Sequence, residues 1–216
     1  MERQKHRIDN LIIPIIYLYF ITGIFWHLFP LTKPVVIKIT PYGLILFPII
    51  IFYYESLKFD LRTILWLFLI FILTMTFEII GVKTGLIFGS YYYNNILGLK
   101  LLGVPFIIGV NWMMIIYGLF SFSQSNVKRN ILLQSILVAF LSLLFDLLLE
   151  PAARKLNYWQ WNTSSVPLQN YISWFAISFL FSLAGLIFKP KKCSNLIFHY
   201  LIAQTIFFTA LNIFLN

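Results

Sequence analysis

Charged residues are scarce in this chain of 216 residues. They make up 11% of the sequence, whereas a soluble globular domain carries about 25%. Hydrophobic residues make up 60% and aromatic residues 19%. This apolar surplus is too large for one water-soluble core, so we expect most of the chain to lie in lipid.

Cysteine and histidine are also rare, and their scarcity excludes several kinds of site. The single cysteine, Cys193, offers neither a disulfide framework nor a Cys–His cluster for zinc or haem. The three histidines, His6, His27 and His199, are too widely separated for the His-rich di-iron site of membrane oxygenases and desaturases. We therefore expect no metal site.

Three motifs that indicate a cofactor are missing as well. The sequence contains no Walker loop and no Gly-rich dinucleotide fingerprint. The last hydrophobic segment, 195–215, has no lysine, which excludes a retinal Schiff base of the kind found in rhodopsins. An enzyme with this sequence is expected to use acid–base chemistry without a cofactor.

The net charge of +9 comes from sixteen basic and seven acidic residues. The basic residues occur in pairs and triplets between apolar runs, as they do in loops at a membrane surface. We therefore expect the bilayer, and not a nucleic acid, as the partner of these residues.

Seven hydrophobic segments are long enough to cross the membrane, for which a helix needs about 20 apolar residues. The runs are continuous and not alternating, which predicts helices and not a β-barrel. The sequence thus predicts an all-α integral membrane protein, with residues 1–216 forming a single transmembrane domain of about seven helices. The second segment is short and the least clearly defined. The expected spans are 10–29, 41–57, 62–82, 104–122, 131–150, 169–188 and 195–215.

The basic residues are unequally divided between the two sides of the membrane. With the N-terminus inside, ten lie inside and six outside. The positive-inside rule then predicts a multi-pass protein of the cell membrane with a cytoplasmic N-terminus. The inside set is Arg3, Lys5, Arg7, Lys58, Arg62, Lys128, Arg129, Lys189, Lys191 and Lys192, and the outside set is Lys33, Lys38, Lys83, Lys100, Arg154 and Lys155.

Two segments, 78–112 and 146–174, resemble each other. Each has an acidic residue near a helix end, a long aromatic loop, a Val-Pro pair that opens the next helix, and a tryptophan seven residues after the proline. Both enter the membrane from the same face, so we predict a parallel two-helix repeat about an axis along the membrane normal. Such a repeat would place Glu78 and Asp146 on opposite walls of one cavity.

Glu55, near the end of the second span and close to Lys58, is expected to be a solvated cap or part of an ion pair. Apart from it, three acidic residues lie within the predicted spans, where ionisable groups are costly and mark functional sites. They are Glu78, Asp146 and Glu150. Asp146 and Glu150 are four residues apart and share a helix face. Two carboxyl groups in a dry site do not both ionise readily, so one can keep its proton and act as a general acid. Alternatively, Glu150 pairs with Arg154 and has a structural role.

Aromatic and amide side chains surround these acids in the sequence. The aromatic residues form either an interfacial belt or the walls of a site that stabilises a cation. The amides either join helices or position a water molecule. The aromatic residues are Tyr91, Trp112, Trp159, Trp161 and Trp174, and the amides are Asn111 and Asn170.

Taken together, the two segments resemble the two motifs of a membrane carotenoid-biosynthesis family. The first motif is carried by Glu78-Ile-Ile-Gly81-Val-Lys-Thr-Gly85-Leu-Ile-Phe-Gly89-Ser-Tyr91, Gly103-Val-Pro105 and Trp112, and the second by Asp146 to Glu150-Pro151, Tyr158-Trp159-Gln-Trp161, Val166-Pro167, Asn170 and Trp174. The sequence departs from the pattern at Ser165 and Ser173, where glycine is expected, which affects the turn geometry more than the chemistry.

The family includes carotenoid hydratases of the bacterioruberin and monocyclic carotenoid pathways, so the resemblance implies a carotenoid 1,2-hydratase. Such an enzyme protonates the terminal double bond of a lycopene or gamma-carotene type substrate and adds water to the tertiary cation. Two alternatives remain open: another cofactor-free carotenoid enzyme, such as a cyclase or isomerase, or a small membrane transporter or carotenoid-binding protein. The expected catalytic residues are Glu78, Asp146 and Glu150, and the expected substrate-binding residues are Tyr91, Asn111, Trp112, Trp159, Trp161, Asn170 and Trp174.

Overall fold

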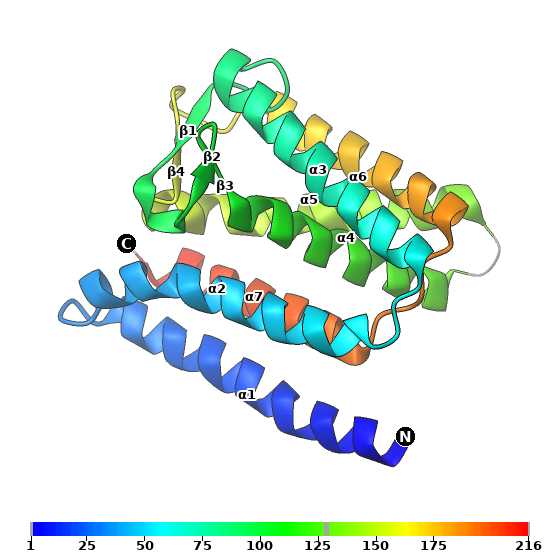
Figure 1. Cartoon of the computed structure of the whole chain (residues 1–216). Coiled ribbons are helices and arrows are strands. Elements are labelled where there is room, and N and C mark those ends of the chain that lie inside the picture. The colour runs from blue at the N-terminus through cyan, green and yellow to red at the C-terminus, as the bar shows by residue number, and fades with distance from the viewer. Residues whose placement is uncertain (1, 128–129, 216) are drawn as a thin grey trace.

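Seven long helices form the fold of residues 2–127 and 130–215, which the computed structural model describes (Figure 1). Each helix is long and apolar enough to cross a membrane. The chain is therefore a multi-pass membrane protein of the predicted all-α class. The helices are α1 (Glu2–Leu28), α2 (Lys33–Ser56), α3 (Leu61–Thr84), α4 (Phe106–Asn126), α5 (Ile131–Lys155), α6 (Leu168–Phe188) and α7 (Asn195–Phe214).

Prolines explain two of the differences between predicted and observed helices. The second span was predicted to begin at residue 41, but α2 begins at Lys33 with Pro34 in its first turn. Proline is tolerated there because the first N–H groups of a helix have no partner within it. The fifth span was predicted to end at residue 150, yet α5 continues through Pro151 to Lys155. The predicted end of this span was therefore too early.

The helices form two groups (Figure 1). Helices α1, α2 and α7 lie together on one side, and α3, α4, α5 and α6 form the other side. Helices α3 and α5 run in the same direction, and α4 and α6 return in the opposite direction. This arrangement has the directions that a parallel two-helix repeat requires, although the repeat itself stays a prediction. The basic pair Lys128 and Arg129, used to predict the orientation, lies outside the described residues.

The two long connections contain short strands that the sequence analysis did not predict. Strand β1 (Tyr91–Tyr93) pairs antiparallel with β4 (Trp159–Trp161), so that Tyr91 is opposite Trp161 and Tyr93 is opposite Trp159. Between them in the chain lie a 3-10 helix, η1 (Asn95–Leu97), and a small hairpin of β2 (Lys100–Leu101) and β3 (Val104–Pro105). The β1–β4 ribbon therefore joins the loop after α3 to the loop after α5.

Gly89 allows this ribbon to approach the start of α6. Its φ of 104° lies in the region that side chains rarely adopt, and a Cβ atom there would be 2.6 Å from Cγ of Pro167. Any larger residue would both strain the backbone and push the loop away from Pro167. Glycine at this position thus keeps the β1 end of the ribbon against α6.

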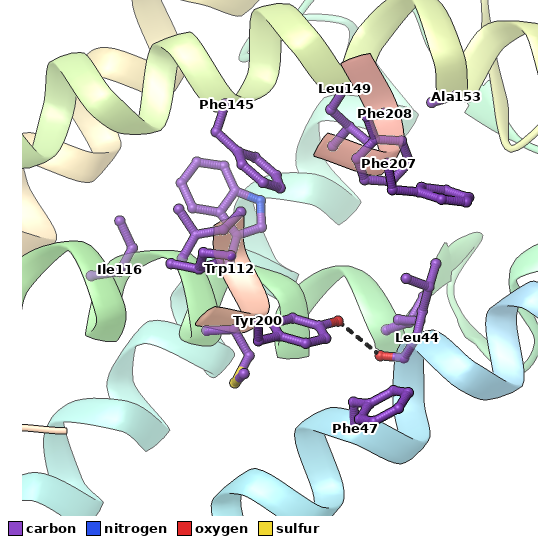
Figure 2. Packing of buried hydrophobic residues seen from close by; sticks show 14 of the residues in the cluster. Leu44, Phe47, Trp112, Ile116, Phe145, Leu149, Ala153, Tyr200, Phe207 and Phe208 are labelled. Atoms are coloured by element: carbon purple, nitrogen blue, oxygen red, sulfur yellow. Dashed lines mark hydrogen bonds between the residues drawn. The ribbon is translucent and has the colours of Figure 1, made fainter. Parts of the chain in front are cut away.

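Buried aromatic and aliphatic side chains fill the space between the two groups of helices (Figure 2). Phe145 of α5, Phe207 and Phe208 of α7 and Leu44 of α2 belong to this cluster, and the hydroxyl of Tyr200 donates to the backbone oxygen of Leu44 at 3.5 Å. This core supports the helices that carry the acidic residues.

Candidate active site

All ten residues predicted for the site line one cavity. Its volume is about 40 Å³, which accommodates about three or four water molecules because each needs roughly 10–15 Å³. The cavity is formed by side chains of α3, α4, α5, α6 and the β1–β4 ribbon. The lining residues are Glu78, Tyr91, Asn111, Trp112, Asp146, Glu150, Trp159, Trp161, Asn170 and Trp174, together with Phe88, Tyr93, Ile108 and Leu149.

Glu78, near the end of α3, is held by two tyrosines of β1. Its Oε2 atom accepts hydrogen bonds from the hydroxyls of Tyr91 at 2.5 Å and Tyr93 at 2.9 Å. Its Oε1 atom accepts from the indole N–H of Trp112 at 3.4 Å. The side chain is buried, with an exposed fraction of 4%. These three donors fix the position of the carboxyl group inside the cavity.

Glu150, on α5, is held in the same way by two tryptophans of β4. Trp159 Nε1 donates to Oε1 at 3.0 Å, and Trp161 Nε1 donates to Oε2 at 2.9 Å. Among residues 11–127 and 130–215, Glu150 and Arg154 form no ion pair within 4.0 Å, and Arg154 donates to the backbone oxygen of Ser164 at 3.4 Å. Glu150 thus faces the cavity with both oxygens occupied by indole donors.

Asp146, one helical turn before Glu150, has a less complete set of partners. Its Oδ2 atom accepts a hydrogen bond from the side-chain amide of Asn170 at 2.7 Å. Its Oδ1 atom has no hydrogen-bond partner within the part of the chain that the structure describes. Because Asp146 is only 1% exposed and lines the cavity, this free oxygen is available to a molecule inside it.

The three carboxyl groups form no close ion pair. Across residues 11–127 and 130–215, none of them has a basic nitrogen within 4.0 Å, and Arg154 acts on Glu150 only from a greater distance. The same residues include no group of three or more His, Cys, Asp or Glu arranged to hold a metal ion. The cavity is thus a place where a transient positive charge would be favourable.

Two stacked tryptophans form one wall of the cavity. The rings of Trp112 on α4 and Trp174 on α6 are nearly parallel, at an angle of 16° with centroids 3.9 Å apart. Each follows the proline of a Val-Pro pair by seven residues, and each helix begins directly after that proline. Their faces are of the kind that attracts cations in a dry site.

The two amides lie in the cavity wall and also join helices. Asn170 of α6 binds Asp146 of α5, as described above, and Asn111 of α4 accepts a hydrogen bond from Gln204 of α7 at 3.2 Å. Their role in joining helices is therefore visible in the structure. Their role in positioning water stays a prediction.

Tyr93 and Gln204 were not among the predicted site residues, although Tyr93 belongs to the aromatic group that flanks the long loops. Tyr93 shares the inward face of the ribbon with Tyr91, whereas Tyr92, which lies between them, is 49% exposed. The alternation in Tyr91-Tyr92-Tyr93 and Trp159-Gln160-Trp161 is the signal that could have revealed two paired strands, because side chains two residues apart share a face. Gln204 has no comparable signal, since its partner Asn111 is 93 residues away in the chain.

Burial keeps the hydroxyls of the ribbon protonated. For both Tyr91 and Tyr93, loss of contact with water raises the pKa well above the usual tyrosine value, and the negative charge of Glu78 raises it further. Both tyrosines therefore carry their protons throughout the physiological pH range and can donate hydrogen bonds to Glu78.

A comparison with protein families agrees with this arrangement. The family model described as "Carotenoid biosynthesis protein" matches residues 39–216, which include the whole cavity. The chain belongs to this family. Searches of curated proteins and of solved structures found no match. Carotenoids are long, apolar polyenes, so membership of this family is compatible with a cavity surrounded by membrane-spanning helices.

Proposed function

We propose that the protein hydrates the terminal isoprene double bond of a linear carotenoid end, giving a tertiary alcohol. The observation that carries this proposal is a water-sized cavity, lined by three carboxyl groups and four tryptophans, inside a protein of the carotenoid biosynthesis family. A substrate dissolved in lipid and a co-substrate present only as water would meet in such a cavity.

Asp146 is the proton donor in this proposal. Its Oδ1 atom is free of other hydrogen bonds among the described residues, so a proton on that atom can reach the substrate. Transfer of the proton to the less substituted carbon of the double bond leaves the positive charge on the tertiary carbon. The faces of Trp112 and Trp174 and the carboxylate of Glu150 stabilise this cation.

Glu78 is the proton acceptor. The oxygen of a water molecule in the cavity bonds to the cationic carbon, and the released proton passes to Glu78. The hydroxyls of Tyr91 and Tyr93 can donate as well as accept, so the hydrogen bonds around Glu78 can adjust when it becomes protonated. The indole donors at Glu150 cannot accept, so they favour a carboxylate that stays ionised.

The atoms balance over this cycle. One water molecule is added to the double bond, Asp146 loses a proton and Glu78 gains one, and the proton returns to Asp146 before the next turnover. The cavity of about 40 Å³ holds water, whereas a cavity that admits benzene measures about 150 Å³. The substrate end must therefore displace side chains in order to enter.

We also propose that the protein lies in the cell membrane with its N-terminus in the cytoplasm, because the basic residues are more numerous on that side. The cavity then lies toward the outer face, near the loops that carry β1 and β4.

The decisive test is the fate of oxygen from water. The protein would be expressed in bacteria that accumulate lycopene or gamma-carotene, grown in oxygen-18 water under ordinary oxygen, and the pigments analysed by mass spectrometry. We expect a new pigment that is heavier by one labelled water. A product of unchanged mass would contradict hydration and indicate a cyclase or isomerase instead. If pigments remain unchanged while the protein is folded in the membrane, the proposal is wrong.

A further inference from the structure

A second cavity lies next to the first and has a different character. It is a groove of about 380 Å³ between α4, α5 and α7. Its lining is apolar except for Thr205, whose hydroxyl donates to the backbone oxygen of Leu201 and is therefore already satisfied. Leu144 and Ile206 in its lining are 38% and 47% exposed, so the groove opens toward the surrounding lipid.

One face of helix α4 lines both the site cavity and the groove. Asn111 lines the cavity, and Ile115, Leu119 and Phe122 line the groove. Steps of four, four and three residues keep these side chains on one side of a helix. From Asn111 to Phe122 the helix rises roughly 16 Å at about 1.5 Å per residue. The groove thus begins beside the site and extends toward the opposite face of the membrane.

On α5 and α7 as well, residues at the cavity are close in the chain to residues that line the groove. On α5, Leu149 lines the cavity, and Phe145, one turn before it, lines the groove. On α7, Gln204 binds Asn111 of the cavity, and its neighbour Thr205 lines the groove. Figure 2 shows Trp112, which lines the cavity, and Phe145, which lines the groove, between α4 and α5.

We propose that this groove binds the polyene chain of the carotenoid whose terminal double bond reacts in the cavity. The inference rests on the proposed function for the identity of the reacting end. The cavity holds only about 40 Å³, so the remainder of a long rod-shaped substrate must lie outside it. An apolar groove that adjoins the cavity, opens to lipid and offers no free polar group suits a conjugated hydrocarbon. The substrate enters sideways from the bilayer.

Narrowing the groove tests this proposal. Leu148 of α5 and Ile202 of α7 line it, whereas Leu147, next to Leu148, is 41% exposed and lines none of the cavities described here. The variants Leu148→Trp and Ile202→Trp fill the groove from two different helices, and Leu147→Trp is the matched control. Each variant would be purified from lycopene-accumulating cells, and the lycopene that copurifies per protein measured by absorbance.

We expect the two groove variants to retain about tenfold less lycopene than the wild type. The tryptophan side chain would take up the space in which the polyene binds, and overpacking of this kind is strongly unfavourable. The control should retain a wild-type amount. Size-exclusion chromatography would show which variants are folded. If Leu148→Trp aggregates, the lycopene retained by Ile202→Trp tests the proposal. In the event that both aggregate, the milder Leu148→Phe and Ile202→Phe provide the same comparison.

Unchanged lycopene in folded groove variants would overturn the proposal, as would a wild-type protein that binds no lycopene. The proposal would also be overturned if the groove variants lost a copurifying phospholipid and kept lycopene, because an acyl chain would then be the occupant. A wild-type protein that binds lycopene in the groove and forms no hydrated product would contradict the proposed function alone. The binding measurement and the oxygen-18 measurement therefore separate the two hypotheses.

Discussion

The two halves of the site use the same construction with different side chains. In each half, a glutamate on a helix is held by two aromatic residues that lie two positions apart on the strand that follows. Glu78 of α3 receives hydroxyl groups from β1, whereas Glu150 of α5 receives indole N–H groups from β4. Hydroxyls donate and accept, but indoles only donate. One framework can therefore hold a carboxyl group that exchanges a proton and another that keeps its charge.

A second difference lies one helical turn before each glutamate. Asp146 precedes Glu150, and Thr74 occupies the corresponding place before Glu78. Thr74 is buried, and its hydroxyl has no hydrogen-bond partner among the described residues. Only the α5 half thus has an extra acid in the cavity. This correspondence relates Glu78 to Glu150, whereas the sequence comparison had related Glu78 to Asp146.

The largest effect is expected from Asp146→Asn, which removes the extra acid and keeps the shape of the side chain. Loss of a general acid should lower the rate of hydration by about 10²–10⁴-fold. The readout is the labelled pigment formed per folded protein. Thr74→Val is the control in the other half, and because its hydroxyl is unpartnered we expect nearly normal activity. Wild-type turnover by Asp146→Asn would show that the extra acid on α5 is not the proton donor.

The two glutamates should differ when each is changed to glutamine. Glu78→Gln cannot take up the proton from water, so a loss of about 10²-fold or more is expected. Glu150→Gln removes a charge that assists the cation, for which a loss of about tenfold is expected. Both rates would be measured in the same membranes with the same pigment. If Glu150→Gln lost more activity than Glu78→Gln, then Glu150 would be the proton acceptor and Glu78 the residue that stabilises the cation.

The stacked tryptophans, one from each half, should have an intermediate to small effect. Trp112→Leu removes an aromatic face, and a loss of roughly 2- to 30-fold corresponds to about 0.5–2 kcal/mol of cation–π interaction. Trp112→Phe should recover most of the activity because it restores a face. Trp26, which is 55% exposed on α1, provides a control as Trp26→Leu. If Leu and Phe at position 112 behave alike, the ring acts only by packing.

The smallest effect is expected within the ribbon. Tyr93→Phe removes one of the two hydroxyls at Glu78, and Tyr91 remains in place. A loss of about three- to tenfold in rate corresponds to one hydrogen bond of about 0.5–1.5 kcal/mol. Tyr92→Phe removes a hydroxyl from the outward face and should have no effect. Equal losses in the two variants would argue against a specific contribution from the inward hydroxyl.

The sequence predicted the seven spans and the residues that meet in the cavity because both depend on local features. Apolar runs identify spans, and costly acids such as Glu78 and Asp146 stand out within them. The ribbon was missed because strands of three residues carry little periodic signal. The contact of Gln204 with Asn111 depends on how α7 packs on α4, which no local pattern encodes. The end of the fifth span was predicted too early, since α5 continues through Pro151 to Lys155 and a helix in a membrane tolerates proline.

The β1–β4 ribbon has a further consequence for how the site forms and opens. Its pairing is extended by hydrogen bonds from Asn94 to Tyr158 and from Asn162 to Ser90, so it includes both long connections. Neither strand can pair until the other connection is in place. The ribbon donors of Glu78 and Glu150 are therefore expected to be gained or lost in a single step, and amide hydrogens of both connections should exchange with solvent as one cooperative unit. A change that opens the ribbon at one glutamate should thus also remove the ribbon donors of the other.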